Sequence, residues 1–373
     1  MVDQIDLLIV GAGPTGCVIA ERAAELLGWR SLIVEKRQHI AGNCFDETHE
    51  SGLLVHRYGP HYFRTDNEDL VRYLSRFTDW VDGSYIVQSL VRDLLYPFPI
   101  NLTTLEKYFA REFTPEAAQS HIDKLKVPIG RPANSEELVI SQVGWDLYKD
   151  FYLGYTKKQW GRHPRDLDAS VCGRIPVRFN RDDRYSDQPF QKLPAAGYTE
   201  MFANMISSPL ITVQLGTDYR EVRCDIAPVR ATVYTGPLDE YFDSALGPLA
   251  WRSLDFEFRE YNQEWVQPCV QINYPDDREY TRTVEIKHTT GQRSARSVVM
   301  YEYPREAGDP YYPVPAPANR ERYAKYRQLA EQETKDKQVY FCGRLAEYRY
   351  INSDVAMVNA LDVFERIRGD LGA

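Results

Sequence analysis

The chain has 373 residues and a formal net charge of −9, and 43% of its residues are hydrophobic. This length predicts two or three structural units with large buried cores. The acidic balance excludes a broad nucleic-acid-binding surface, and the 13% of aromatic residues excludes a disordered chain.

The first predicted element is a nucleotide-binding unit. The apolar run 5–10 predicts a buried strand, and Gly-Ala-Gly-Pro-Thr-Gly at 11–16 leads from it into an amphipathic helix. A second apolar run, 31–34, ends at Glu35. The glycines allow a tight turn and close approach of a diphosphate to the helix N-terminus, and the acid can accept hydrogen bonds from a ribose. Strand, glycines, helix and acid together predict dinucleotide binding.

The residues after Glu35 favour FAD over NAD. An extended segment follows the acid, and near the C-terminus a strand ends in glycine at 339–343 before a helix at about 354–367, as in FAD-binding folds. Only one Gly-x-Gly-x-x-Gly is present, so no separate nicotinamide domain is expected. The predicted cofactor-binding residues here are Gly11, Gly13, Pro14, Thr15, Gly16, Glu35, Lys36, Arg37, Gly42, Asn43, Gly343 and Arg344.

The remaining pattern predicts an α/β fold in which a Rossmann-like FAD-binding domain carries insertions. A strand at 233–237 returns to the cofactor sheet, so this domain comprises 1–67, 195–243 and 335–373. We predict a helical domain at 68–160, with helix starts at Thr114 and Asn134. Alternating residues predict an antiparallel β-sheet substrate domain from 161–194 and 244–334. It includes a mobile lid at 161–184 and a last surface helix capped by Asn319.

Positive charge is concentrated in one stretch of this acidic chain. Between 157 and 184, eight Lys and Arg residues face four Asp residues, and aromatic side chains are interleaved with them. Arginines suit a diphosphate and an aromatic ring suits a stacked base. The alternatives are a solvated surface for the charges and ordinary core packing for the rings.

The chain resembles bacterial UDP-galactopyranose mutases along essentially its whole length. Besides the nucleotide-binding segments, the resemblance is carried by 58–63, 154–161, 174–178, 234–237, 280–282, 302–304, 310–313 and 343–348. It implies an isomerase that interconverts the pyranose and furanose forms of a UDP-sugar. It further implies that the flavin acts in its reduced form, with its N5 attacking the anomeric carbon, so that the cofactor supplies the nucleophile.

The resemblance also assigns roles to individual residues. His61 is implied as a catalytic residue beside the flavin, near N5, and Arg174 and Arg282 are implied as the two catalytic arginines that bind the diphosphate. Tyr350 is implied at both cofactor and substrate. The further substrate-binding residues implied by the resemblance are Phe151 and Tyr155 for the uracil, Trp160 near the sugar, Tyr185 and Tyr311 for the phosphates, and Asn273.

Two positions depart from the family pattern. Arg64 replaces a histidine near the flavin and the sugar, and its donors could reach the carbonyl of a 2-acetamido group. UDP-N-acetylgalactosamine is therefore a second candidate substrate beside UDP-galactose, and the alternative is that Arg64 faces phosphate or a surface acid. Ile351 stands where a second tyrosine often follows the first, and it either reshapes the pocket or packs behind it.

The alternatives to a mutase are an FAD-dependent oxidoreductase of the same fold and a non-catalytic UDP-sugar-binding module. The six cysteines and seven histidines show no metal-ligand spacing, so no metal is predicted. No secretion signal and no apolar run of about 20 residues are visible, which predicts a cytoplasmic protein without membrane insertion. The expected partners are a UDP-sugar, an external flavin reductant and, from the resemblance, a second copy in a homodimer, with no nucleic acid.

Overall fold

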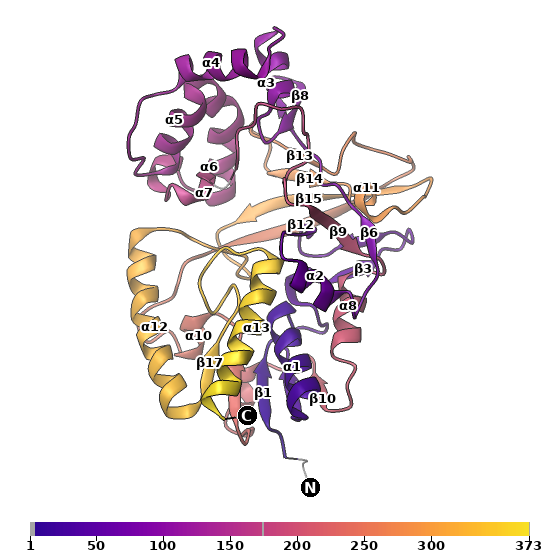
Figure 1. Cartoon of the computed structure of the whole chain (residues 1–373), viewed down its shortest axis with the longest axis vertical. Coiled ribbons are helices and arrows are strands. Elements are labelled where there is room, and N and C mark those ends of the chain that lie inside the picture. Colours follow the sequence, from indigo (N-terminus) through magenta and orange to yellow (C-terminus); the bar gives the residue numbers. More distant parts are fainter. Residues whose placement is uncertain (1–3, 174, 373) are drawn as a thin grey trace.

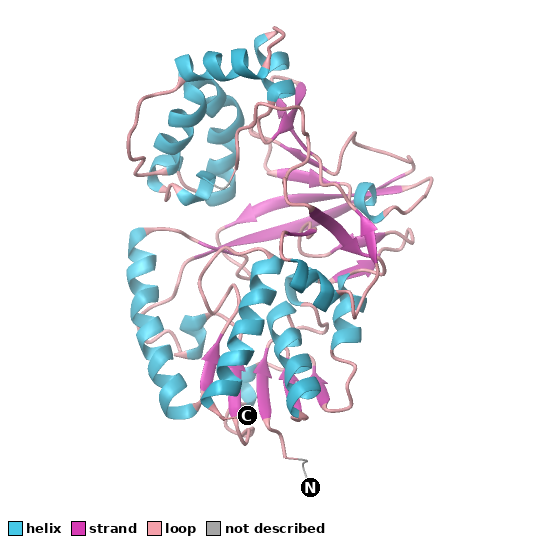
Figure 2. Cartoon of the chain, in the orientation of Figure 1, coloured by secondary structure: helices cyan, strands magenta, loops and turns pink. Residues whose placement is uncertain are grey.

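The computed structural model describes residues 4–173 and 175–372. A parallel sheet wrapped by helices holds both ends of the described chain, a large mixed sheet lies beside it, and a helical lobe lies beyond that sheet (Figures 1 and 2). Within the described ranges, no helix is long and apolar enough to cross a bilayer. The predicted α/β fold, with a Rossmann-like unit, an added helical part and an antiparallel sheet, is confirmed.

The parallel sheet has five strands in the order β10-β2-β1-β11-β17. All four of its pairings are parallel, and β1 is buried along its whole length. Such strands are covered on both faces, which is why the sequence shows short continuous apolar runs here. The strand bounds are β1 Leu7–Val10, β2 Ser31–Val34, β10 Ile211–Gln214, β11 Ala231–Tyr234 and β17 Val339–Phe341.

Helices cover both faces of this sheet. On one face α1 packs along α13, and their side chains share one core with α8 and the sheet. On the other, α10 and α12 form a smaller core against β17 (Figure 1). The bounds are α1 Pro14–Leu27, α2 Glu68–Leu74, α8 Tyr198–Met205, α9 Tyr219–Val222, α10 Leu238–Tyr241, α12 Pro317–Lys337 and α13 Ser353–Asp370.

The second sheet has seven strands in the order β16-β12-β15-β14-β13-β7-β8. Its pairings are antiparallel except for β13 with β7, which run parallel. Smaller sheets, β5-β9-β6 and β3-β4, complete the β-structure. The bounds are β3 Asp46–Thr48, β4 Leu54–His56, β5 Phe63–Thr65, β6 Trp80–Asp82, β7 Val87–Val91, β8 Leu94–Phe98, β9 Phe190–Pro194, β12 Trp251–Tyr261, β13 Gln271–Asn273, β14 Arg282–Val284, β15 Ser297–Arg305 and β16 Tyr312–Pro313, with the short helix α11 at Lys287–Thr290.

The helical lobe is held together by a core that also includes residues of β7 and β8. Thr114 and Asn134 cap two of its helices as predicted, each side chain accepting a hydrogen bond from the first turn. The bounds are α3 Leu102–Phe109, α4 Pro115–Leu125, α5 Ser135–Leu147, a π-helical turn Tyr148–Leu153, α6 Gly154–Trp160 and α7 Ser170–Gly173, and short 3-10 turns lie at Gly42–Cys44 and Pro164–Asp166.

Three details of the sequence interpretation are corrected by the structure. Residues 80–98 lie within the predicted helical segment but form β6, β7 and β8, so the lobe begins only at α3. Asn319 does not cap the surface helix: α12 begins at Pro317 after the N-cap Ala316, and Asn319 donates instead to the carbonyl of Val314. This helix packs on β17 of the five-stranded parallel sheet, although the prediction placed it with the substrate sheet.

Candidate functional site

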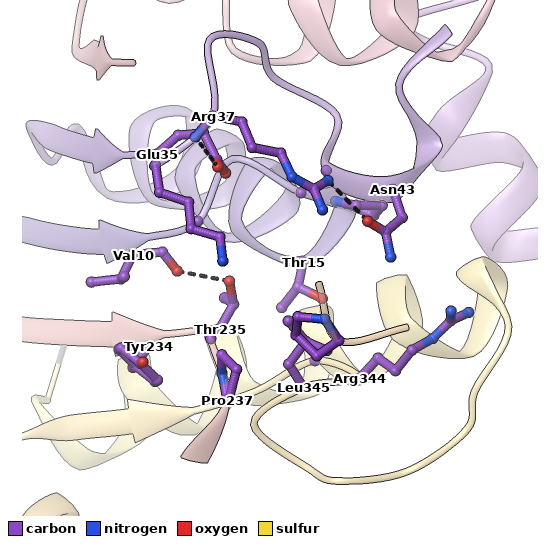
Figure 3. Close-up of a pocket in the computed structure, with 18 of the residues that line it drawn as sticks. Val10, Thr15, Glu35, Arg37, Asn43, Tyr234, Thr235, Pro237, Arg344 and Leu345 are labelled. Carbon is purple, nitrogen blue, oxygen red and sulfur yellow. Dashed lines mark hydrogen bonds between the residues drawn. The ribbon is translucent and has the colours of Figure 1, made fainter. Parts of the chain in front are cut away.

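The first cavity lies at the carboxyl ends of the parallel strands and has an empty volume of about 1250 Å³. Its walls come from the ends of β1, β2 and β11, the start of α1 and the loop after β17 (Figure 3). In a parallel α/β sheet this edge is where ligands bind, next to the N-terminus of the first helix.

Two glycines of the 11–16 motif are required by close packing. Gly11 has φ +104°, and a Cβ at this position would lie 2.2 Å from Thr235 Oγ1. A Cβ on Gly16 would lie 2.0 Å from the carbonyl oxygen of Gly11, so only glycine lets α1 approach β1 this closely. Gly13 differs, because a Cβ there would meet only Gly42 Cα, at 3.8 Å. Its backbone therefore lies open to a ligand on the cavity side.

The acid after β2 organises the loop beside the cavity. One carboxylate oxygen of Glu35 accepts from the backbone N–H of Ala12 and the other from that of Arg37, each at 2.8 Å. The Arg37 side chain donates to Asn43 Oδ1 at 2.9 Å (Figure 3). The Arg37 guanidinium also lies over the Tyr58 ring. Glu35 thus links the glycine turn to this loop while facing the cavity.

The C-terminal glycine-ended strand closes the other side of the cavity. Gly343, with φ +98°, lies against Thr15, whose Oγ1 would be 3.0 Å from a Cβ there. Arg344 donates from Nε and Nη2 to the carbonyl of Ile351, at 3.2 and 2.6 Å, and so holds the loop before α13. In the described chain neither α1 nor α13 has a side-chain cap, so both N-termini retain backbone N–H donors near this cavity.

The structure brings most of the predicted cofactor residues to this cavity. Gly16 supports the helix packing instead of lining it, and Tyr350 lines the neighbouring cavity. Those that line it are Gly11, Gly13, Pro14, Thr15, Glu35, Lys36, Arg37, Gly42, Asn43, His61, Gly343 and Arg344.

A second, larger cavity, with an empty volume of about 2490 Å³, adjoins the first. It is lined from the mixed sheet, α6, residues between 171 and 178, and the start of α13. The residues common to both cavities are Asn43, His61, Arg344, Ile351, Asn352 and Ser353. A ligand in one cavity can therefore touch a ligand in the other at this junction.

All the predicted substrate residues that the structure describes line this second cavity, while Arg174 lies outside the described residues. Trp160 ends α6, and its ring lies 6.1 Å from that of Tyr312, which in turn is 5.1 Å from Tyr350. Burial raises the pKa of both Tyr155 and Tyr311, so these phenols keep their protons and can donate. The predicted residues at this cavity are His61, Arg64, Phe151, Tyr155, Trp160, Tyr185, Asn273, Arg282, Tyr311 and Tyr350.

Three residues that lie side by side on β13, β14 and β15 place polar side chains at or beside the larger cavity. Asn273 pairs with Arg282 across β13 and β14, and Arg282 pairs with Glu302 across β14 and β15. Arg282 donates from Nε and Nη2 to Glu302 Oε2, and Nη2 also lies 3.3 Å from the Tyr312 hydroxyl. Paired residues share a face of the sheet, so Arg282 is held beside Asn273 at the cavity.

His61 sits at the junction as a neutral imidazole. Burial, helped by the positive charge of Arg344, lowers the pKa of His61 to about 3. Its Nδ1 lies 2.9 Å from the Gly59 carbonyl oxygen, so Nδ1 carries the proton and donates there. The same logic leaves Nε2 as an acceptor. The backbone N–H of His61 donates to His56 Nδ1 at 3.0 Å, which fixes the loop.

Arg64 comes from β5 and reaches the same cavity. Its Nη1 donates to Ser186 Oγ and to Gln188 Oε1, both at 2.9 Å, and its guanidinium lies 5.6 Å from the centre of the Tyr62 ring. Ile351, the other departure from the family pattern, is buried and lines both cavities.

Comparisons with known proteins agree with this geometry. A family model described as "GLF: UDP-galactopyranose mutase" matches residues 150–350, and another described as "NAD(P)-binding Rossmann-like domain" matches residues 9–77. The sequence is 38% identical to the "Probable UDP-galactopyranose mutase" of Klebsiella pneumoniae and 36% identical to the "dTDP-fucopyranose mutase" of Escherichia coli. Each alignment covers 95% of this chain, with 93% and 96% of the respective relative.

The chain belongs to the UDP-galactopyranose mutase family. The predicted resemblance is confirmed, and so is the prediction that the protein is an enzyme of the isomerase class. Among solved structures, the "Crystal structure of reduced UDP-Galactopyranose mutase" superimposes with a TM-score of 0.77 at 15% identity, over 98% of this chain and 96% of the other. That likeness confirms the fold.

Sequence reasoning missed several cavity residues of this mutase. Tyr312 follows a predicted tyrosine in Pro310-Tyr-Tyr-Pro313, so the motif itself could have indicated it. Arg178 and Arg349 also line the larger cavity. Residues 217–220 line the first cavity, because β10 pairs with β2 and brings the loop after it to the same sheet edge. Glu240, in α10 after β11, also lines it.

The basic stretch of the mutase contributes less to the cavity than its charge indicates. Arg181 pairs with Glu106 and Arg184 with Asp182 at the surface. For these two arginines the alternative of a solvated surface charge therefore holds. Among the described basic residues of 157–184, Arg178 alone lines the larger cavity. The other arginines there, Arg64, Arg282, Arg344 and Arg349, come from distant parts of the sequence.

Proposed function

We propose that this mutase interconverts the pyranose and furanose forms of a UDP-sugar with the help of bound, reduced FAD. The observation that carries the proposal is the continuity of the two cavities. A dinucleotide-type cavity meets a larger cavity lined by tyrosines and arginines, and neutral His61, Arg344 and Asn352 line both. The family's relatives are named as mutases of UDP- and dTDP-sugars.

The residues of the first cavity fit FAD. Gly13 leaves room for a pyrophosphate at the uncapped start of α1, and Glu35 faces the place of a ribose. The uncapped start of α13 gives a second set of N–H donors next to Arg344 and the junction. When bound and reduced, FAD supplies the nucleophile for the anomeric carbon of the sugar.

The chain's own residues bind and orient the substrate. Arg282, fixed by Glu302, and protonated Tyr311 provide a cation and a hydroxyl donor for a diphosphate. Phe151 and Tyr155 offer rings for the uracil. His61 offers Nε2 as a neutral acceptor at the junction, where a sugar hydroxyl and the cofactor meet. Arg174 keeps its proposed place as the second diphosphate arginine.

The sugar we propose is galactose, with N-acetylgalactosamine as a second candidate. Arg64 is half-buried, and its Nη1 is fixed by Ser186 and Gln188. A guanidinium held in this way can donate to an acetamido carbonyl, which a histidine at this position does less readily because it is shorter and has fewer donors.

Residues 161–184 remain our proposed lid. They begin at Gly161, which ends α6 with φ +63°. Buried Arg252 donates from Nε to the carbonyl of Gln159 at 3.0 Å and so fixes the end of α6 from which the segment departs. We also propose an external reductant for the flavin and a homodimer, which sedimentation of the purified protein tests.

The experiment that tests the function separates the sugar products. Purified protein is examined for flavin absorbance, reduced chemically, and incubated with UDP-galactose or UDP-N-acetylgalactosamine. Chromatography then resolves the pyranose and furanose forms. We expect UDP-galactofuranose from the wild type, while Arg174→Ala keeps its flavin and loses turnover. Full turnover by Arg174→Ala contradicts the role of that arginine, and a wild type without flavin or product contradicts the function.

A further inference from the structure

Three buried side chains that line the larger cavity, those of Tyr85, Gln271 and Asn273, are joined by a chain of hydrogen bonds. The Tyr85 hydroxyl donates to Gln271 Oε1 at 2.8 Å, and Gln271 Nε2 donates to Asn273 Oδ1 at 2.7 Å. Tyr85, Gln271 and Asn273 are 2%, 4% and 5% exposed. Gln271 and Asn273 stand two residues apart on β13, so their side chains leave the same face of the sheet.

The hydrogen bonds all run in one direction, from donor to acceptor, and this direction sets which end of the Asn273 amide faces the cavity. Burial raises the pKa of Tyr85 well above its usual value, so the phenol keeps its proton, and because its partner Gln271 Oε1 can only accept, the phenol is the donor. Gln271 accepts with Oε1 and must therefore turn its NH2 group towards Asn273. Asn273 accepts that bond with Oδ1, and its own NH2 group is the part left for the cavity that Asn273 lines.

A positively charged neighbour of Asn273 makes this orientation suitable for binding an electron-rich ligand. Arg282 lies directly across from it on β14, with its guanidinium also at the cavity. A donor amide beside a guanidinium suits the electron-rich oxygens of a nucleotide sugar. An amide turned the other way would place a carbonyl oxygen next to those oxygens and repel them.

We propose that Gln271 and Tyr85 are positioning residues, which hold the Asn273 amide so that it donates to the bound nucleotide sugar. They act through Asn273, and the inference rests on the proposed function. Two contacts of these residues support it: the Tyr85 ring stacks at 4.2 Å on Tyr62, and the Tyr85 carbonyl oxygen accepts from the N–H of Tyr185. Tyr85, where the chain of hydrogen bonds starts, is thus fixed through both its ring and its backbone.

The test is a double-mutant cycle on the reduced holoenzyme with UDP-galactose. Asn273→Ala should lower kcat/KM on the order of tenfold, the worth of one hydrogen bond to a charged or polar ligand group. Gln271→Met should lose most of the same factor and Tyr85→Phe a part of it, and neither should cause a further loss when added to Asn273→Ala. Gln88→Met is the matched control, because Gln88 pairs with Ile272 on the other face of the sheet.

A crystal structure of each holoenzyme variant gives a readout that needs no turnover. We expect the Asn273 side chain to turn or become disordered in Gln271→Met and to stay fixed in Gln88→Met. An Asn273 side chain unmoved in Gln271→Met, or kinetic losses that add in full to those of Asn273→Ala, overturns the proposal. A wild type without turnover on any UDP-sugar contradicts the proposed function, and the crystallographic comparison still decides the positioning.

Discussion

Arg282 and Glu302 lie opposite each other on β14 and β15, and the guanidinium donates from Nε and Nη2 to one carboxylate oxygen at 2.8 and 2.6 Å. The Glu302 side chain is fully buried, whereas that of Arg282 is 18% exposed towards the larger cavity. The acid therefore fixes an arginine that offers its remaining donors to a ligand.

This pair predicts a separation of stability from activity. Arg282→Ala leaves a buried carboxylate without its cation, which should lower the free energy of unfolding by about 3–5 kcal/mol. The double variant Arg282→Met with Glu302→Leu removes both charges and should recover most of that loss while turnover stays absent. Urea unfolding and product chromatography measure the two effects. Recovery of turnover in the double variant contradicts a role for Arg282 in substrate binding.

The glycine motif predicts a contrast between two glycine-to-alanine variants. Gly16→Ala places a methyl group 2.0 Å from the Gly11 carbonyl oxygen, and this overpacking should cost about 1–3 kcal/mol and lower the bound flavin. Gly369→Ala in α13 meets no atom within 4 Å and should stabilise the protein by about 0.5–1 kcal/mol, because alanine favours helix. Thermal unfolding and the flavin-to-protein absorbance ratio test both. Equal stabilities would contradict the packing role of Gly16.

His56, at the end of β4, and His61, at the junction of the two cavities, predict a loss of stability in acid. Burial lowers the pKa of His56 to about 4, and burial with nearby charges lowers that of His61 to about 3. The unfolded chain binds these protons near pH 6.5, so the stability that the neutral rings contribute is complete above that pH. It should fall as the pH drops from 6.5 towards 4, by up to about 1.4 kcal/mol per pH unit for each ring.

A variant isolates the contribution of one ring. His56→Asn keeps an oxygen that can accept from the His61 N–H but cannot titrate. Denaturant unfolding between pH 4 and 8 should then show a shallower slope below pH 6.5. A slope identical to that of the wild type would mean that His56 is not buried as a neutral ring in solution.

Arg64 predicts a change in sugar preference. Arg64→His should lower turnover of UDP-N-acetylgalactosamine relative to UDP-galactose by on the order of tenfold, since a donor to the acetamido carbonyl is lost. Arg57→His is the control, because Arg57 is an exposed arginine that pairs with Glu47 and does not line the cavity. Equal galactose turnover in wild type and Arg64→His, with no N-acetyl activity in either, would refute this specificity role.

The sequence alone predicted the structure correctly where one short motif defines both the local fold and a binding site. Gly11 to Glu35 carried strand, turn, helix and acid within one short stretch, and the structure has all four. Residues 87–91 show why other elements were missed: Val87, Ser89 and Val91 alternate and are buried, but the pattern is short, and the partner β13 lies far along the chain. The sequence interpretation therefore assigned this segment to the helical domain, together with the helical patterns on either side of it.

The geometry of the site depended on pairings that no local pattern contains. Asn273 and Arg282 were predicted as separate residues, and only the register of β13 with β14 makes them neighbours. Residues 217–220 reach the nucleotide cavity because β10 extends the sheet next to β2. The chemistry of single residues was thus readable from the sequence, whereas their juxtaposition was not.

We propose an isomerisation that uses a flavin without net oxidation. The most direct measurement follows flavin absorbance and the pyranose-to-furanose ratio together, in anaerobic, chemically reduced protein with excess UDP-galactose. We predict that the same ratio is reached from either sugar form while the flavin stays reduced, and that oxidised protein shows no turnover. Equal turnover by oxidised protein, or flavin reoxidation in proportion to the sugar consumed, would contradict the account.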